Sequence, residues 1–110
     1  MRFTAIMVGL CLGIAASAAA QDAKVTKGQG VYAAQKCSLC HSIDGKGNAK
    51  GTLDGVGSKL TNDEIRSWIT DAPAMAAKTK SARKPAMKAY TLPKDDMEAL
   101  AAYLSTLKKK

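Results

Sequence analysis

The chain has 110 residues, of which 17 are Lys or Arg and 9 are Asp or Glu, so its formal net charge at pH 7 is +8. This length fits a single domain and excludes a large, self-sufficient apolar core, so we expect the fold to need a staple. The lysines are too interrupted to form a disordered tail, apart from the final three residues, 108–110.

The N-terminus has the pattern of a secretory signal peptide. Arg2 precedes an apolar run over residues 6–16, and three alanines follow at 18–20. The apolar run is too short to span a bilayer, so we expect a cleaved signal peptide over 1–20 and a mature domain over 21–110. Such a chain would reside in the periplasm without membrane insertion and would not meet nucleic acid. An uncleaved membrane anchor is the alternative.

The first helix of the mature chain is expected over about 25–36, with Val25 and Tyr32 on one stripe. Gly28 and Gly30 weaken this segment as a helix. We therefore expect both glycines to serve close packing.

The next five residues are Cys37-Ser38-Leu39-Cys40-His41. Each Cys can add to one haem vinyl group as a thioether, and the adjacent imidazole can then ligate the iron. The spacing therefore predicts one covalently attached haem c, held by Cys37 and Cys40 with His41 as an axial ligand.

Two alternatives compete for this motif, a zinc half-site and a thioredoxin-like dithiol. Zinc needs about four N, S or O donors, and the chain offers one further Cys, at position 11, and no further His. A redox dithiol would need a βαβ setting, and no strand-like alternation surrounds the two cysteines.

The rest of the chain predicts a glycine-rich loop and two more helices. Five glycines occur within 44–58, where a loop could follow a flat group closely. Thr61 and Glu64 form a capping box at the start of a second helix, which Pro73 is expected to end. Pro93 opens a third helix. Acidic residues near its start favour the helix dipole, namely Asp95, Asp96 and Glu98. Its apolar stripe is formed by Met97, Leu100, Ala101, Leu104 and Leu107.

The sixth iron ligand is expected to be a methionine. His41 is the only His, so a second His ligand is excluded within the chain. Met97 belongs to the apolar stripe of the third helix and is expected in the core. Met75 and Met87 are both expected in irregular chain after the second helix; Pro85 stiffens the approach to Met87, which makes Met75 the runner-up.

These residues resemble the small monohaem class I cytochromes c over nearly all of 21–110. The resemblance rests on the haem motif, the glycine-rich loop and the following similar positions: Gly28, Tyr32, Leu53, Asp54, Gly55, Val56, Gly57, Trp68, Met87, Lys88, Ala89, Tyr90, Leu100, Ala101, Ala102, Tyr103 and Leu104. It implies an all-α fold, with three or more helices wrapped around a covalently attached haem and the N- and C-terminal helices crossing.

The resemblance also implies roles for individual residues. His41 and Met87 would be the axial ligands, and Trp68, Tyr90 and Leu53 would line the haem pocket. The helix crossing would involve Gly28, Tyr32, Leu100 and Tyr103. The sequence departs from the family at two places: members often have a Pro near position 52, whose carbonyl steadies the axial His, where this chain has Thr52, and often a Pro directly after the Met, where it has Lys88.

Positive charge concentrates in the segment expected beside the haem edge, at Lys78, Lys80, Arg83, Lys84 and Lys88. A patch of one sign near the reactive edge would steer the protein toward a redox partner with an acidic surface, whereas scattered lysines would serve solubility alone.

The sequence thus predicts a periplasmic one-electron carrier, not an enzyme, that acts as a monomer or in transient complexes. The alternative is the haem subunit of a larger dehydrogenase or oxidase complex. A peroxidase or a haem ligand sensor fits less well, because peroxidase chemistry needs a distal acid or base, usually a His, and no second His exists.

Overall fold

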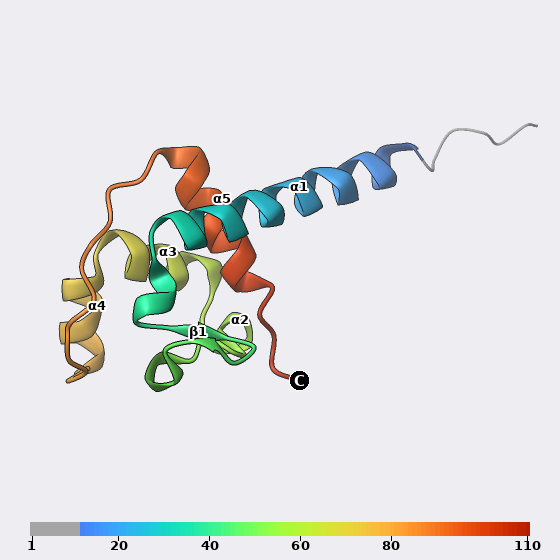
Figure 1. The fold of residues 1–110 in the computed structure, drawn as a ribbon. Coiled ribbons are helices and arrows are strands. Elements are labelled where there is room, and N and C mark those ends of the chain that lie inside the picture. The colour runs from blue at the N-terminus through green and yellow to red at the C-terminus, as the bar shows by residue number, and fades with distance from the viewer. Residues whose placement is uncertain (1–11) are drawn as a thin grey trace, which may run out of the picture.

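The computed structural model describes residues 12–110, and most of the regular structure in them is helical (Figure 1). The elements in chain order are α1 (Leu12–Ala34), the 3-10 helix η1 (Cys37–Leu39), strands β1 (Ser42–Ile43) and β2 (Lys46–Gly47), the 3-10 helix η2 (Ala49–Gly51), and helices α2 (Val56–Lys59), α3 (Asn62–Thr70), α4 (Ala72–Thr79) and α5 (Lys94–Ser105). The two strands form one short antiparallel hairpin. The expected fold class, a small helical domain, is confirmed.

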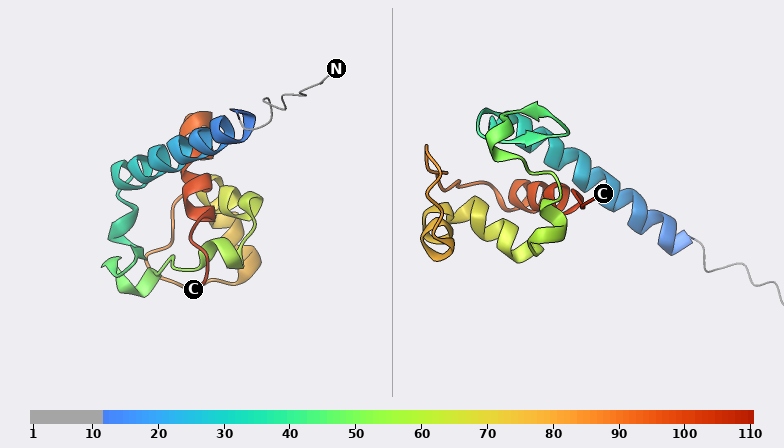
Figure 2. Two further views of the ribbon diagram at one scale, coloured as in Figure 1. Left: turned by 90° about the vertical axis from the view of Figure 1, so that its right-hand side faces the viewer. Right: turned by 90° about the horizontal axis from the view of Figure 1, so that it is seen from below.

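Helices α1 and α5, from opposite ends of the chain, pack against each other, as all three ribbon views show (Figures 1 and 2). Gly28 lies at the contact: a Cβ built there would overlap the carbonyl oxygen of Ala99 and the Cβ of Tyr103. Beside it, the rings of Tyr32 and Tyr103 meet edge to face with centroids 6.1 Å apart. The expected helix crossing is confirmed, and the missing side chain at Gly28 is what lets the two backbones approach.

Gly30 does not share this role. A Cβ built at Gly30 meets no atom within 4 Å. The expectation that both glycines serve close packing is therefore wrong for Gly30, which faces away from α5.

Helix α1 begins earlier than expected, at Leu12 instead of about Val25, and ends at Ala34. Residues 18–24 are exposed, and Val25 is half-buried. Residues 1–11 of the expected signal peptide lie outside the described residues, so cleavage after residue 20 stays a prediction. Within residues 12–110, no helix has both the length and the apolar character needed to cross a membrane.

Helix α3 begins with the expected capping box. The Thr61 hydroxyl accepts a hydrogen bond from the Glu64 amide at 3.1 Å, and the Glu64 carboxylate accepts one from the Thr61 amide at 3.0 Å. The hydrogen bonds that Glu64 receives at this cap lower the pKa of its carboxyl.

The segment after α3 differs from the expectation. We expected Pro73 to end the second helix and irregular chain to follow, but α3 already ends at Thr70 and α4 begins at Ala72. Pro73 lies in the first turn of α4, where its missing N–H costs no helical hydrogen bond. Met75 therefore lies on a helix and not in irregular chain.

Helix α5 begins after Pro93, with Asp95 and Asp96 in its first turn, as expected. Its apolar side packs into the core, whose buried members are Val31, Ile43, Ile65, Ile69, Leu100, Ala101 and Leu104. Met97 and Leu107 pack against this core, although Leu107 comes after the helix has ended. The core therefore joins α1, α3 and α5 and holds β1 beneath them.

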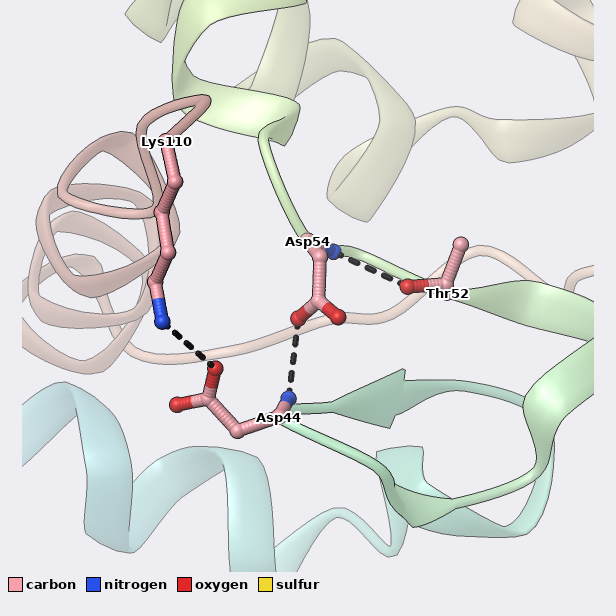
Figure 3. Close-up of polar contacts among 4 residues, drawn as sticks. All are labelled: Asp44, Thr52, Asp54 and Lys110. Atoms are coloured by element: carbon pink, nitrogen blue, oxygen red, sulfur yellow. Dashed lines mark hydrogen bonds and ion pairs between the residues drawn. The ribbon is translucent and has the colours of Figure 1, made fainter.

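The glycine-rich stretch 44–58 is more ordered than a plain loop, because it contains β2, η2 and α2. The Asp54 carboxylate accepts a hydrogen bond from the Asp44 amide at 2.8 Å, and the Asp54 amide donates to the Thr52 hydroxyl at 3.2 Å (Figure 3). Lys110 lies 4.0 Å from the Asp44 carboxylate, an exposed ion pair of small energetic weight. These contacts fix the path of the chain just beyond the Cys37–His41 turn.

Candidate functional site

The two cysteines and the His share one tight turn. Helix α1 ends near Ala34, Lys36 adopts a left-handed backbone conformation with φ of 56°, and η1 follows at Cys37. The carbonyl of Cys37 accepts hydrogen bonds from the amides of Cys40 at 3.1 Å and His41 at 2.9 Å. Both thiols are free, and burial raises the pKa of the Cys37 thiol. The turn thus presents two unpaired sulfurs and an imidazole within five residues.

The His41 ring is held by the chain ten residues later. Its Nδ1 donates a hydrogen bond to the carbonyl oxygen of Gly51 at 2.9 Å. Since a carbonyl can only accept, Nδ1 carries the proton and Nε2 keeps a lone pair for a metal. Burial of the half-buried ring lowers the pKa of His41, which favours this neutral form.

This hydrogen bond supplies the partner that the departure at Thr52 had put in doubt. A backbone carbonyl does not depend on which side chain follows it, so Gly51 serves where the family often uses a Pro. The N–H···O=C contact fixes the ring orientation, and such a contact raises the basicity of the other ring nitrogen toward a metal.

Asn48, which the sequence did not single out, holds the turn from outside. Its amide donates to the carbonyls of Ser38 at 3.1 Å and His41 at 3.0 Å, and its side chain donates to the carbonyl of Leu39 at 3.2 Å. One residue thus satisfies three carbonyls of the haem motif. The sequence alone does not indicate that an Asn seven residues after the motif binds its carbonyls.

Arg83 also reaches this turn. We expected it only as a member of the basic patch, but its guanidinium donates a hydrogen bond to the carbonyl of Cys40 and lies against Gly51. The contact joins residues 43 positions apart. Sequence spacing gives no indication of such a contact.

The three methionine candidates lie in different settings. Met97 packs against the core, as expected. Met75 is half-buried on α4, where its amide donates to the Asp71 carbonyl at 3.1 Å. Met87 is half-buried in the irregular chain between α4 and α5, residues 80–93, hereafter the Met87 segment.

The expected pocket residues Trp68, Tyr90 and Leu53 are all half-buried. Tyr90 lies at the end of the Met87 segment with its amide bonded to the Ile69 carbonyl at 2.8 Å, and the Lys88 ammonium lies 5.0 Å from the centre of its ring. Burial, with smaller contributions from Cys37 and Cys40, raises the pKa of Tyr90. Leu53 and Tyr90 pack against the core, whereas Trp68 is not part of that cluster in the described residues.

The residues of this site fit a covalently bound haem better than zinc. The donor set is two free thiols with an adjacent imidazole whose Nδ1 is already engaged, which suits thioether attachment and axial ligation through Nε2. Among residues 12–110, no three His, Cys, Asp or Glu side chains gather in a way that could hold a metal ion.

A comparison with protein-family models matched the family described as Cytochrome c over residues 25–108. Comparisons with curated proteins and with solved structures gave no match. The matched range covers most of the chain, including the C-terminal part of α1, the Cys37–His41 turn, the Met87 segment and α5, and it confirms the resemblance inferred from the residues. The chain therefore belongs to the cytochrome c family, and this membership implies a covalently bound haem c and haem-based electron transfer.

Proposed function

We propose that this chain is a soluble periplasmic one-electron carrier with a single c-type haem, attached at Cys37 and Cys40 and ligated by His41 and Met87. The observation that carries the proposal is the His41–Gly51 hydrogen bond of 2.9 Å, which orients a neutral imidazole directly beside two free thiols. A haem bound there supplies a one-electron Fe(III)/Fe(II) couple.

Each residue of the turn has its own task in this proposal. Cys37 and Cys40 form the thioether bonds, and His41 offers Nε2 while Gly51 keeps Nδ1 occupied. Asn48 keeps the turn in shape by binding its carbonyls. With both axial positions filled by the protein, small ligands such as oxygen and peroxide are kept from the metal, which favours electron transfer over ligand chemistry.

Met87 suits the sixth position better than Met75. Met75 is fixed in the hydrogen-bonded turns of α4, and the Thr79 hydroxyl donates to its carbonyl at 2.8 Å. Met87 lies on irregular chain between Ser81 and Tyr90, and Arg83 of the same stretch donates a hydrogen bond to the carbonyl of Cys40. Ligation by a thioether together with an imidazole would raise the reduction potential of a bound haem.

The partner is a redox protein with an acidic surface. Five exposed cations lie on α4 and the Met87 segment: Lys78, Lys80, Arg83, Lys84 and Lys88. The Arg83 side chain connects this stretch to the carbonyl of Cys40. Leu39, between the two cysteines, is 70 % exposed. A small apolar contact beside a charged surface suits the small, transient interfaces of electron-transfer complexes.

The alternative is a permanent haem subunit of a dehydrogenase or oxidase complex. Purification from the native periplasm separates the two: a free carrier elutes as a monomer, whereas a subunit elutes with a larger chain in fixed stoichiometry. Recovery of the chain in the membrane fraction with residues 1–20 still attached would contradict the cleaved signal peptide.

Covalent attachment is tested on the matured protein. We expect the haem to resist acid-acetone extraction and to remain with the polypeptide in denaturing electrophoresis. Cys37→Ala together with Cys40→Ala should give a chain without bound haem and without stable structure, because the small core needs the cofactor. Haem that extracts freely from the wild-type protein would overturn the proposal.

Axial ligation is tested by a matched pair of variants. Met87→Ala should abolish the sulfur-to-iron charge-transfer band of the ferric protein, lower the reduction potential and let the ferrous protein bind carbon monoxide. Met75→Ala should leave the band in place. The reverse pattern would assign the sixth position to Met75.

A further inference from the structure

The Met87 segment is weakly fixed by its own backbone. The Ser81 amide donates to the Ala76 carbonyl at 2.9 Å and the Tyr90 amide to the Ile69 carbonyl at 2.8 Å. Between these two anchors, residues 82–89 make no backbone hydrogen bond to the described chain. Irregular chain with so few backbone hydrogen bonds opens at low free-energy cost unless something else holds it.

The Arg83 side chain supplies the one hydrogen bond of this interval. Its guanidinium donates to the carbonyl oxygen of Cys40, the second cysteine of the haem motif. Neither of the anchors at Ser81 and Tyr90 contacts that motif, since both bind carbonyls of the α3–α4 region. Arg83 is therefore the polar contact between the chain that carries Met87 and the chain that carries His41.

Gly51 makes room for this contact. A Cβ built at Gly51 would overlap the Arg83 guanidinium and the carbonyl of Cys40. The same residue accepts the hydrogen bond from His41 Nδ1 at 2.9 Å. The guanidinium thus lies on the backbone that orients the axial imidazole, and the two ligand-bearing stretches meet at Gly51.

We propose that Arg83 is a positioning residue that latches the Met87 segment to the Cys37–His41 turn and so keeps the methionine sulfur in its axial position. The proposal rests on the axial roles of His41 and Met87 in the proposed function. A guanidinium suits this task because its charge-assisted N–H donors are fixed in a planar fork and bind a carbonyl more strongly than a neutral donor would.

The latch is tested by the rate at which imidazole binds to the ferric haem protein. Imidazole is a neutral probe and binds only after the methionine leaves, so its rate at saturating concentration reports opening of the Met87 segment. Arg83→Met should speed this rate about tenfold, as expected for loss of one hydrogen bond from a charged donor. The sulfur-to-iron band at equilibrium should persist, because the ligand itself is intact.

Two further variants separate the geometry of the guanidinium from its charge. Arg83→Lys keeps the charge but lacks the planar fork, so it should also speed imidazole binding; it serves equally if Arg83→Met fails to fold. Arg66→Met removes the same charge from α3, where the guanidinium donates to the Asn62 side chain at 2.7 Å, and should keep the wild-type rate.

Wild-type rates in both Arg83 variants would overturn the latch. So would a wild-type rate in Arg83→Lys beside a fast rate in Arg83→Met, since the planar fork of the guanidinium would then be unnecessary. A wild-type ferric protein without the sulfur-to-iron band would instead overturn His/Met ligation and, with it, the latch. The two failures are therefore distinguishable.

Discussion

The helix crossing and the Met87 segment are held in opposite ways. At the crossing, α1 and α5 meet through buried apolar surface and through Gly28, whose position leaves no room for a side chain. In the Met87 segment, residues 82–89 are almost entirely exposed and are fixed by the Arg83 side chain. Close packing tolerates little change, whereas a segment held by few polar contacts can be altered without loss of the fold. Stability and ligation should therefore respond to different substitutions.

The strongest way to break the crossing is Gly28→Ala. The added methyl would overlap the Ala99 carbonyl and the Tyr103 Cβ, so the helices must separate, and we expect a loss of about 3 kcal/mol in the free energy of unfolding. Gly30→Ala is the matched control on the same helix. Its methyl meets open space, so helix propensity should raise stability by up to about 1 kcal/mol. Chemical denaturation of both variants measures the difference; equal losses would contradict the packing role of Gly28.

Charge reversal in the Met87 segment should affect association and leave the crossing intact. Lys84→Glu with Lys88→Glu should slow association with an acidic redox partner about tenfold at low salt, and more than it changes dissociation. At 1 M salt, where the screening length is about 3 Å, the difference should nearly vanish. Stopped-flow electron transfer measures both rates. Lys24→Glu with Lys59→Glu makes the same charge change on α1 and α2 and should have less effect; an equal effect would show that net charge alone matters.

Helix α3 connects the two regions, because Ile65 and Ile69 belong to the core and the Ile69 carbonyl anchors Tyr90. Thr61→Ala removes the hydroxyl that accepts from the Glu64 amide at 3.1 Å, so we expect a loss of about 1 kcal/mol in the free energy of unfolding. Thr26→Ala, an exposed change inside α1, should cost nothing. If the two variants are equally stable, the capping box contributes nothing measurable.

Tyr32→Phe is expected to have the smallest effect on stability at neutral pH. The Tyr32 hydroxyl is buried without a hydrogen-bond partner in the described chain, so its removal should alter stability by less than about 1 kcal/mol. Burial above all, aided by Cys37 and Tyr103, raises the pKa of Tyr32 to about 12 from an ordinary value of 10.0.

Because folding raises the pKa of Tyr32, stability should fall at alkaline pH. An unfolded chain ionises Tyr32 first, so the stability linked to the neutral hydroxyl is complete below pH 10 and is lost as the pH rises toward 12. The Phe variant should lose less stability than the wild type over this interval. Denaturant titrations at several alkaline pH values test this, and parallel losses in the two proteins would refute it.

The sequence was most informative where structure depends on neighbours in the chain. The capping box of Thr61 and Glu64, the start of α5 after Pro93 and the core position of Met97 all follow from local spacing, and the structure confirms them. Helix α4 was missed because Pro73 was interpreted as a terminator, although a first-turn Pro followed by alanines also fits a helix start.

The contacts that hold the Cys37–His41 turn could not be predicted from local sequence. The motif itself predicts attachment and one axial ligand, but the partners that hold it come from elsewhere in the chain. Gly51 acts through its backbone carbonyl, Asn48 acts through its backbone amide and its side chain, and Arg83 acts across 43 positions. Gly28 and Gly30 look equivalent in the sequence, yet only the placement of α5 distinguishes them.

The distances along the chain between these contacts also imply an order of assembly. The Cys37–His41 turn closes through hydrogen bonds three and four residues apart, whereas the Arg83–Cys40 contact closes a separation of 43 residues. Short loops lose less conformational entropy on closing than long ones. We therefore expect the turn to form on an otherwise open chain, while its two thiols are still accessible for thioether formation. The Arg83 contact would form among the last steps, once α3 and α4 have brought the Met87 segment back to the turn.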